Sequence, residues 1–181
     1  MPSAADTRAA ILEAALAQLA EPGADVGIES IAERAGVSRA TLYYHFHGRE
    51  SLLAGLIERT LEELSATAYR AAADGDPHAV LEGTLDFYCA NAVRCRFLFT
   101  HLLSAPQSVD PLMRRQQQAI AASLSECLAR QGVKGEVDLV AEALQGQVNG
   151  VVFGRLVAGE PLERDRLAAV LGDLADRVVA P

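Results

Sequence analysis

Helix-breaking residues divide the chain into segments in which apolar side chains recur every three or four positions. Breaks fall at Pro22-Gly23 and Gly36, and Asp76-Pro77 and Asp110-Pro111 each place an N-cap residue before a proline at the first helical position. No segment alternates apolar and polar residues for long enough to form a strand. Alanine and leucine, which favour helices, dominate an apolar content of 50%. The sequence therefore predicts an all-α fold of about nine helices.

The expected helices form two groups, with three short helices up to residue 47 and a larger helical body after it. One helix precedes Pro22, and helices of roughly 15 and 20 residues follow the two Asp-Pro pairs. The others are expected at about 28–35, 38–44, 49–72, 96–104, 136–158 and 163–179.

The composition excludes several classes of protein. Cys89, Cys95 and Cys127 include no C-x-x-C pair, so neither a disulfide framework nor a zinc knuckle is expected, and a reducing compartment fits. Residues 1–8 lack the apolar core of a signal peptide, and the longest apolar stretch, 148–158, is too short and too polar to span a bilayer. We therefore expect a cytoplasmic protein that makes no membrane contact.

Residues 28–53 have the spacing of two helices packed across a tight turn. Ala32 lets the second helix cross close to the first, and Gly36 allows a positive φ in the turn. The apolar residues placed to clamp the helices together are Ile28, Ile31, Val37 and Leu42. The outer side of the second helix is left with Arg39, Ala40, Thr41, Tyr43 and Tyr44. In a helix-turn-helix, the second helix enters the major groove of DNA.

This stretch resembles the signature of the TetR family of bacterial transcriptional regulators. The matching positions are Ile31-Ala32, Ala35-Gly36-Val37-Ser38, Thr41-Leu42-Tyr43, His45-Phe46, Glu50 and Leu52, with Arg49 keeping the charge where lysine is commoner. The layout of a short first helix, this motif, a long linking helix and a helical body is similar too. The resemblance implies a helix-turn-helix DNA-binding domain at residues 1–48 and a helical domain at 49–181 that binds an effector and dimerises.

The DNA contacts that the resemblance implies surround the second helix of the motif: Ser38, Arg39, Ala40, Thr41, Tyr43, Tyr44, His45 and Arg49. Among them, Arg39 is expected to read a guanine and Ala40 to touch a thymine methyl group. The hydroxyl groups of Ser38 and Thr41 are expected at phosphates or base edges, whereas Tyr43, His45 and Arg49 hold phosphates. Ser38 is also a candidate helix cap, and His45 a candidate core histidine. Phe46 is expected in the core beneath the motif.

The negative net charge of the whole chain argues against a nucleic-acid partner, but the charge is unevenly distributed along the sequence. The whole chain carries −8, and four arginines against six acidic residues give residues 1–49 a net charge of −2. Between residues 34 and 49, however, three arginines and two histidines occur without any acidic residue. The surface of the motif is therefore expected to be locally positive, and a dimer doubles that surface.

Three glycines recur every four residues near the C-terminus, at Gly146, Gly150 and Gly154. Each glycine inside a helix costs about 1 kcal/mol relative to alanine, so a row of them indicates close approach of another helix. That helix belongs either to the same chain or to a second copy. In the TetR family the last two long helices form the dimer interface, which the resemblance places at Gly146, Gly150, Val151, Gly154, Leu167, Leu171 and Leu174.

An effector pocket is expected among the middle helices. Its candidate residues combine apolar walls with a few polar groups: Phe87, Tyr88, Asn91, Phe99, His101, Leu102, Met113, Gln117 and Gln147. The competing interpretation is that the aromatic and aliphatic members are ordinary core residues. Cys89 and Cys95 raise the alternative of redox sensing, but no neighbouring residue marks either thiol as activated.

The combined interpretation is a homodimeric transcriptional regulator, most simply a repressor, that binds a palindromic DNA operator and responds to an unidentified small molecule. No cofactor and no metal are expected. Catalysis is disfavoured because the sequence contains no G-x-S-x-G, H-E-x-x-H or phosphate-binding glycine loop. A helical interaction protein that has lost DNA binding is a third alternative, disfavoured by the intact Arg39, Thr41 and Tyr43.

Overall fold

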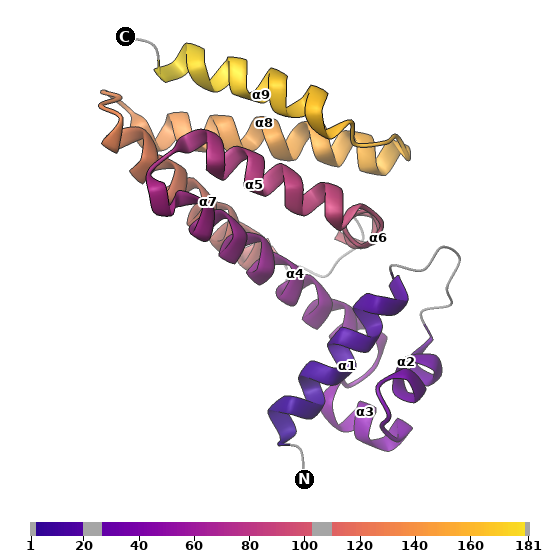
Figure 1. Ribbon diagram of the computed structural model, residues 1–181. Coiled ribbons are helices and arrows are strands. Elements are labelled where there is room, and N and C mark those ends of the chain that lie inside the picture. The colour runs from indigo at the N-terminus through magenta and orange to yellow at the C-terminus, as the bar shows by residue number, and fades with distance from the viewer. Residues whose placement is uncertain (1–2, 20–26, 103–109, 180–181) are drawn as a thin grey trace.

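The computed structural model describes residues 3–19, 27–102 and 110–179, and these ranges contain nine α-helices, one 3-10 turn and no strands (Figure 1). The helices are α1 (Ala4–Leu19), α2 (Ile28–Arg34), α3 (Arg39–His45), α4 (Arg49–Ala71), α5 (Pro77–Ala90), α6 (Ala92–Leu102), α7 (Asp110–Arg130), α8 (Val137–Ala158) and α9 (Arg164–Val179), with the turn η1 (Ala72–Asp74) after α4. The predicted all-α fold is confirmed.

Side-chain caps begin several of these helices, and one of them is at the predicted Asp76-Pro77 pair. Ser3 and Asp6 bond reciprocally at the start of α1, with Ser3 N donating to Asp6 Oδ2 at 2.9 Å and Asp6 N donating to Ser3 Oγ at 3.1 Å. Asp76 Oδ1 accepts from His78 N at 2.9 Å, and Pro77 is the first residue of α5. Local side-chain chemistry thus fixes where these helices start.

One helix starts earlier than predicted. The segment expected to begin at Arg96 is helical from Ala92, and only Asn91 separates α6 from α5. The Asn91 side chain donates to Phe87 O at 2.9 Å and its own carbonyl accepts from Cys95 N at 2.8 Å. No proline or glycine marks this joint, so the sequence contains no breaker to reveal it. The predicted end at residue 104 lies outside the described residues.

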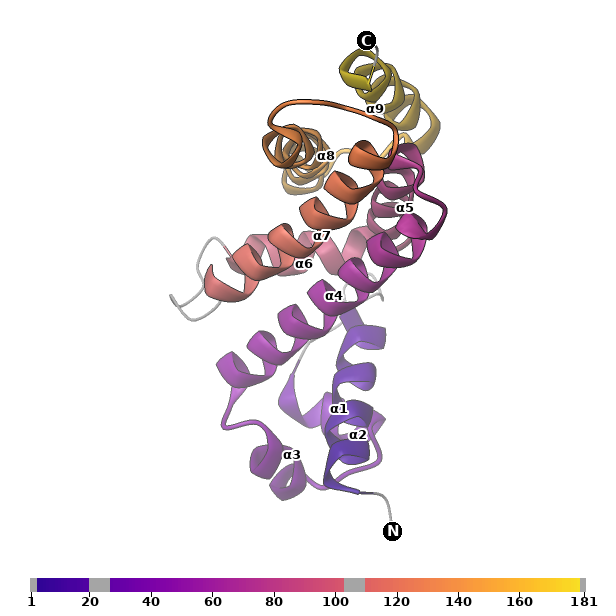
Figure 2. The same ribbon diagram turned by 90° about the vertical axis from the view of Figure 1, so that its left-hand side faces the viewer.

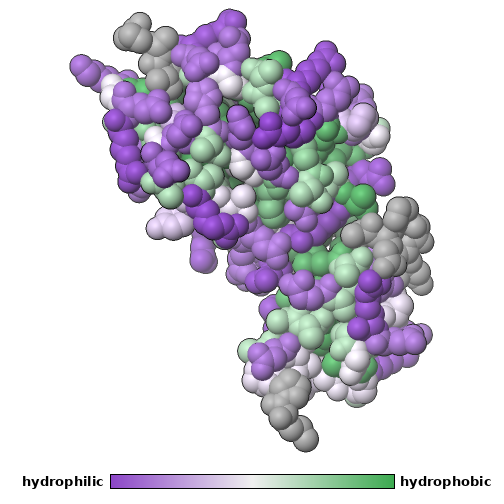
Figure 3. All heavy atoms as spheres, viewed as in Figure 1, coloured by the Kyte–Doolittle hydropathy of each residue, from purple (hydrophilic) through white to green (hydrophobic). Residues whose placement is uncertain are grey.

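Helix α4 connects two groups of helices that lie at its opposite ends (Figures 1 and 2). Helices α1–α3, here called the head, surround the N-terminal part of α4. Helices α5–α9, here called the body, lie toward its C-terminal end, with α8 and α9 farthest from the head. No helix in the described ranges has the length and apolar character needed to cross a membrane. On the face shown in Figure 3, hydrophilic side chains separate several apolar patches.

Two hydrophobic cores stabilise the head and the body, and α4 contributes to both. Leu52, Leu56 and Ile57 are buried with the head helices, whereas Leu64 and Ala68 of the same helix are buried in the body core. Helix α6 is shared in the same way, because Leu98 joins the head core and Cys95 the body core. Movement of either helix therefore disturbs packing in both parts of the molecule.

Candidate functional site

Helices α2 and α3 pack across the turn that the sequence predicts. Gly36 has a φ of 65°, in the left-handed region that favours glycine, and Val37 N donates to Ala32 O at 3.0 Å to close the turn. Ile31 and Leu42 are fully buried on the facing sides of the two helices. This packing leaves the opposite side of α3 in solvent.

The exposed side of α3 carries most of the predicted DNA contacts. Ser38, Arg39, Ala40, Tyr43, Tyr44 and Arg49 are exposed, and Thr41 and His45 are half-buried. Ser38 is the N-cap of α3, because its Oγ accepts from Thr41 N at 3.0 Å, and it also shares a 2.8 Å hydrogen bond with Thr41 Oγ1. The His45 ring meets that of Tyr44 edge to face at 5.2 Å. The structure thus brings the eight side chains to one end of the head.

Arg39 is paired within the head, which the sequence did not indicate. Its Nη1 lies 2.6 Å from Glu29 Oε1 on α2, and its guanidinium lies 5.6 Å from the centre of the Tyr43 ring. Tyr43 first, and Glu29 second, raise the pKa of Arg39 above its ordinary value. Because the turn between α2 and α3 is four residues long, Glu29 and Arg39 are ten positions apart, and no local motif links them.

Phe46 lies beneath the motif, as the sequence predicts. Its side chain is 1% exposed, and its backbone N–H closes α3 by donating to Leu42 O at 2.8 Å. The Arg8 guanidinium of α1 lies 5.1 Å from the centre of its ring. Phe46 therefore joins α3 to α1 and to the start of α4.

The body contains a cavity of about 380 Å³ between α4, α5, α6, α7 and α8. The side chains and backbone that line it are Leu61, Leu64, Tyr88, Phe99, Met113, Gln116, Gln117, Ile120, Gln145, Asn149, Gly150 and Phe153. Four predicted pocket residues are among them: Tyr88, Phe99, Met113 and Gln117.

The other predicted pocket residues lie elsewhere or are not described. Phe87 is buried in the body core with the Arg94 guanidinium 5.6 Å from its ring centre, and Asn91 ends α5. Gln147 points away from the cavity, since it lies two residues beyond Gln145 and two positions rotate a helical side chain by about 200°. The side chains of His101 and Leu102 lie outside the described residues.

The sequence reasoning missed the α8 wall of the cavity. Gln145, Asn149 and Phe153 are spaced four residues apart and so share one face of the helix. Two amide side chains one helical turn apart, followed by an aromatic side chain at the next turn, are the signal that points to this wall. Tyr88 Oη donates to Asn149 Oδ1 at 3.0 Å, which joins the wall to α5.

The three cysteines are free thiols, of which Cys95 and Cys127 are buried and Cys89 is half-buried. Burial is the largest cause raising the pKa of Cys89 and Cys127, and it raises the pKa of Cys95 to about 12. A thiol with a raised pKa is a poor nucleophile at neutral pH, which is the opposite of what a redox-sensing cysteine requires.

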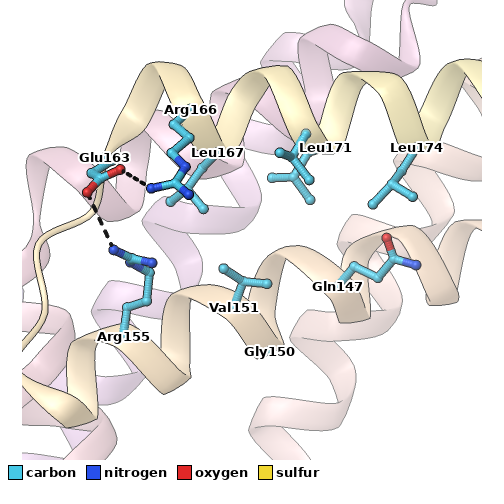
Figure 4. Close-up of a pocket in the computed structure, with 10 residues that line it drawn as sticks. Gln147, Gly150, Val151, Arg155, Glu163, Arg166, Leu167, Leu171 and Leu174 are labelled. Atoms are coloured by element: carbon cyan, nitrogen blue, oxygen red, sulfur yellow. Dashed lines mark hydrogen bonds and ion pairs between the residues drawn. The ribbon is translucent and has the colours of Figure 1, made fainter.

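A second hollow is an open groove of about 480 Å³ between α8 and α9 (Figure 4). Val151 of α8 and Leu167, Leu171 and Leu174 of α9 point into it, and Gly150 lies on its floor. At one end, Glu163 lies 3.8 Å from Arg155 and 3.1 Å from Arg166. Five of the residues predicted for a dimer interface therefore line a single apolar groove.

The glycine row of α8 faces open space in the described part of the chain. A Cβ atom built on Gly146, Gly150 or Gly154 would have no atom within 4 Å beyond its own helix and chain neighbours. Gly55 of α4 is different, because a Cβ there would lie 3.0 Å from the Phe46 ring. Close packing within the chain thus accounts for Gly55 but not for the glycine row.

An exposed recognition helix in a helix-turn-helix, carried on a separate helical body with a cavity, defines a DNA-binding transcriptional regulator. Comparison with known proteins agrees. Residues 11–56 match the family described as bacterial regulatory proteins, tetR family. The HTH-type transcriptional regulator BetI of Burkholderia mallei (strain NCTC 10229) is 26% identical over 183 residues, which cover 96% of this chain and 94% of that protein.

Solved structures have the same fold. A putative TetR-family transcriptional regulator from Mesorhizobium loti MAFF303099 superposes with a TM-score of 0.76 at 19% identity, covering 99% of this chain and 96% of that one. A TetR-like transcriptional regulator from Rhodococcus sp. RHA1 gives a TM-score of 0.65 at 26% identity, covering 99% and 98%. The helix-turn-helix at residues 11–56 is thus that of the TetR family of transcriptional regulators, and the whole chain has the fold of TetR-family regulators.

Proposed function

We propose that this regulator is a homodimeric repressor that binds a palindromic operator and is released when a small molecule occupies the body cavity. Residues 1–48 bind DNA in this proposal, and residues 49–181 dimerise and bind the effector. A protein with this task acts in the cytoplasm, where bacterial DNA lies. The observation that carries the proposal is that α4 and α6 each place side chains both in the head core and beside the cavity.

The DNA contacts follow from the exposed side of α3. Arg39 is the base-reading residue of the proposal, since its guanidinium can donate to O6 and N7 of one guanine, and Ala40 faces a thymine methyl group. Tyr43, Tyr44, His45 and Arg49 contact phosphates, and Arg49 does so from the N-terminus of α4. Ser38 and Thr41 contribute hydroxyl groups beside the cap that they form together.

The groove between α8 and α9 supports the dimer. It is apolar at its centre and ionic at one end, which is the usual composition of a protein interface. A two-fold axis at this groove brings the same face of both copies together, as a symmetric dimer requires. Two heads on one dimer then contact half-sites about 34–36 Å apart on the same side of the DNA.

Gly154→Ala tests the dimer. In the monomer this change meets no neighbouring atom and is expected to stabilise α8 by up to about 1 kcal/mol. In the dimer the added methyl group separates two closely packed helices, and we expect association to weaken by about 1–3 kcal/mol. Analytical ultracentrifugation measures the dissociation constant of the dimer, and urea denaturation measures stability.

Gly172→Ala of α9 is the matched control for this prediction. The nearest atom to a Cβ at Gly172 is His78 Nδ1 at 3.7 Å, an ordinary contact outside the groove. This variant is expected to leave the dissociation constant unchanged. A Gly154→Ala protein that dimerises as tightly as the wild type contradicts the assignment of the interface.

The effector step follows from the two shared helices. Leu61 and Leu64 of α4 line the cavity, one to two turns beyond Leu56 and Ile57 in the head core. In α6, Phe99 lines the cavity and the adjacent Leu98 is buried in the head core. A ligand that binds more tightly when these helices are displaced favours the conformation in which the two heads no longer match the operator spacing. The size of this shift is set by the difference between the ligand's affinities for the two conformations.

The central experiment is an electrophoretic mobility shift with purified protein and the duplex DNA that flanks its own gene. We expect binding of two chains per site, with a preference over unrelated duplex that survives added competitor and an affinity that falls steeply with salt. Deletion of the gene is expected to raise expression from the flanking promoter. Equal affinity for all duplexes contradicts operator recognition, and lowered expression contradicts repression.

A further inference from the structure

The walls of the body cavity contain aromatic, aliphatic and amide groups but no charged side chain among the described residues. Tyr88, Phe99 and Phe153 form a chain of rings, with centres 6.0 Å apart between Tyr88 and Phe99 and 5.4 Å apart between Phe99 and Phe153. Leu61 and Ile120 complete the apolar surface. A charged ligand here loses its hydration without gaining an opposite charge, so the lining favours a neutral molecule with aromatic character.

Most buried polar groups of the cavity already have partners within the protein. Tyr88 Oη donates to Asn149 Oδ1 at 3.0 Å, and burial raises the pKa of Tyr88 so that its hydroxyl stays protonated. Gln116 Nε2 donates to the backbone carbonyl of Leu61, which fixes this amide against α4. The single donor of Tyr88 is therefore taken, and one of the two N–H groups of the Gln116 amide is taken as well.

Gln145 is the exception. Its side chain is 4% exposed, and its Nε2 is buried without a hydrogen-bond partner among the described residues. Buried donors are almost always paired, because an unpaired one keeps the cost of losing its water. Since Gln145 lies in the cavity wall, the missing partner points to a ligand that brings a hydrogen-bond acceptor.

We propose that the cavity binds a neutral aromatic molecule that carries a carbonyl-type acceptor, and that Gln145 Nε2 donates a hydrogen bond to that acceptor. The proposal rests on the proposed function in placing the effector in this cavity. It adds the chemical class of the effector and the residue that selects it. Apolar rings pack on Tyr88, Phe99 and Phe153, and Gln145 fixes the orientation of the polar end.

Four probes of similar size separate the contributions to binding. Benzophenone has two rings and a carbonyl, and diphenylmethane replaces the carbonyl by a methylene group. Diphenylacetate adds a negative charge and benzhydrylammonium a positive one. Isothermal titration calorimetry with the full chain is expected to show benzophenone binding about tenfold more tightly than diphenylmethane, with both charged probes weaker still.

Gln145→Leu is the diagnostic variant, with Gln118→Leu as its control. The leucine removes the donor at nearly constant volume and leaves no buried amide unpaired, so the midpoint of thermal unfolding is not expected to fall. The variant is expected to bind benzophenone and diphenylmethane equally. Gln118 is exposed on α7 outside the cavity lining, and its leucine variant is expected to keep the tenfold preference for the ketone.

The outcomes separate this assignment from the proposed function. Benzophenone binding no tighter than diphenylmethane, no detectable binding of benzophenone, or tighter binding of a charged probe overturns the ligand class. None of these results affects operator recognition, which the mobility shift measures without ligand. If benzophenone binds with the expected dependence on Gln145 but leaves operator affinity unchanged, the ligand class is supported and the proposed release mechanism fails.

Discussion

Phe46→Ala is expected to lower the free energy of unfolding by about 3–5 kcal/mol and to abolish operator binding. Phe46 is 1% exposed at the junction of α1, α3 and α4. Its ring packs against Gly55 of α4 so closely that a Cβ atom at Gly55 would lie 3.0 Å from it. Removing the ring opens a cavity in the head core, where Phe46 is the largest fully buried side chain. Chemical denaturation followed by circular dichroism measures the loss of stability.

Tyr44→Ala is the control that separates stability from DNA contact. Tyr44 is two residues earlier in the sequence, but its side chain is 76% exposed and contributes little to the core. We expect its stability to change by less than about 0.5 kcal/mol while its affinity for the operator falls. A Phe46→Ala protein with wild-type stability contradicts the assignment of Phe46 to the head core, and a Tyr44→Ala protein with unchanged affinity removes Tyr44 from the DNA contacts.

The parts of the fold that follow from local chemistry could be predicted from the sequence. Ser38 and Asp76 cap α3 and α5 because a short polar side chain binds backbone N–H groups two or three residues away. Gly36 turns the chain because it tolerates a positive φ. The joint at Asn91 was missed, because there an ordinary amide side chain takes the place of a proline or glycine.

The two functional regions differ in how far the sequence defines them. The predicted DNA contacts lie on or beside one helix of seven residues, so their spacing along the chain determines which side chains share a surface. The cavity combines residues from five helices, and its polar selectivity depends on which amide is already paired. Gln116 and Gln145 cannot be distinguished by sequence pattern, because only the packed structure gives one a partner and leaves the other without.

The glycine row of α8 shows a third case. Its period of four indicates close packing against another helix, and the sequence leaves open whether that helix belongs to the same chain. In the structure Gly154 faces open space, while Gly55 faces the Phe46 ring. A row of small residues therefore predicts a contact surface, but only the surrounding packing separates a surface within the chain from one available to a second copy.

Arg39→Ala is expected to weaken operator binding by about 1–3 kcal/mol and to relax specificity at one base pair. The guanidinium is exposed on α3, and in the proposed complex its bidentate contact with guanine distinguishes that base pair from the others. Fluorescence anisotropy with the operator and with duplexes altered at single positions measures both effects. Equal loss of affinity for every duplex contradicts base reading and moves Arg39 to the phosphate contacts.

Glu29→Gln is expected to raise the affinity of the protein for unrelated duplex DNA. Glu29 Oε1 lies 2.6 Å from Arg39 Nη1, with both side chains largely exposed, so solvent screens the ion pair and it contributes little to stability. On DNA, however, it competes with phosphates for the guanidinium and adds a negative charge beside the recognition helix. Without Glu29, Arg39 is free to bind any phosphate, and affinity for unrelated duplex rises more than affinity for the operator.

Glu33→Gln removes the same charge from an exposed position on α2 and controls for net charge alone. If both variants raise non-specific affinity equally, the pairing of Glu29 with Arg39 has no role in specificity; a larger rise for Glu29→Gln shows that this ion pair restrains the arginine until the correct base is in place.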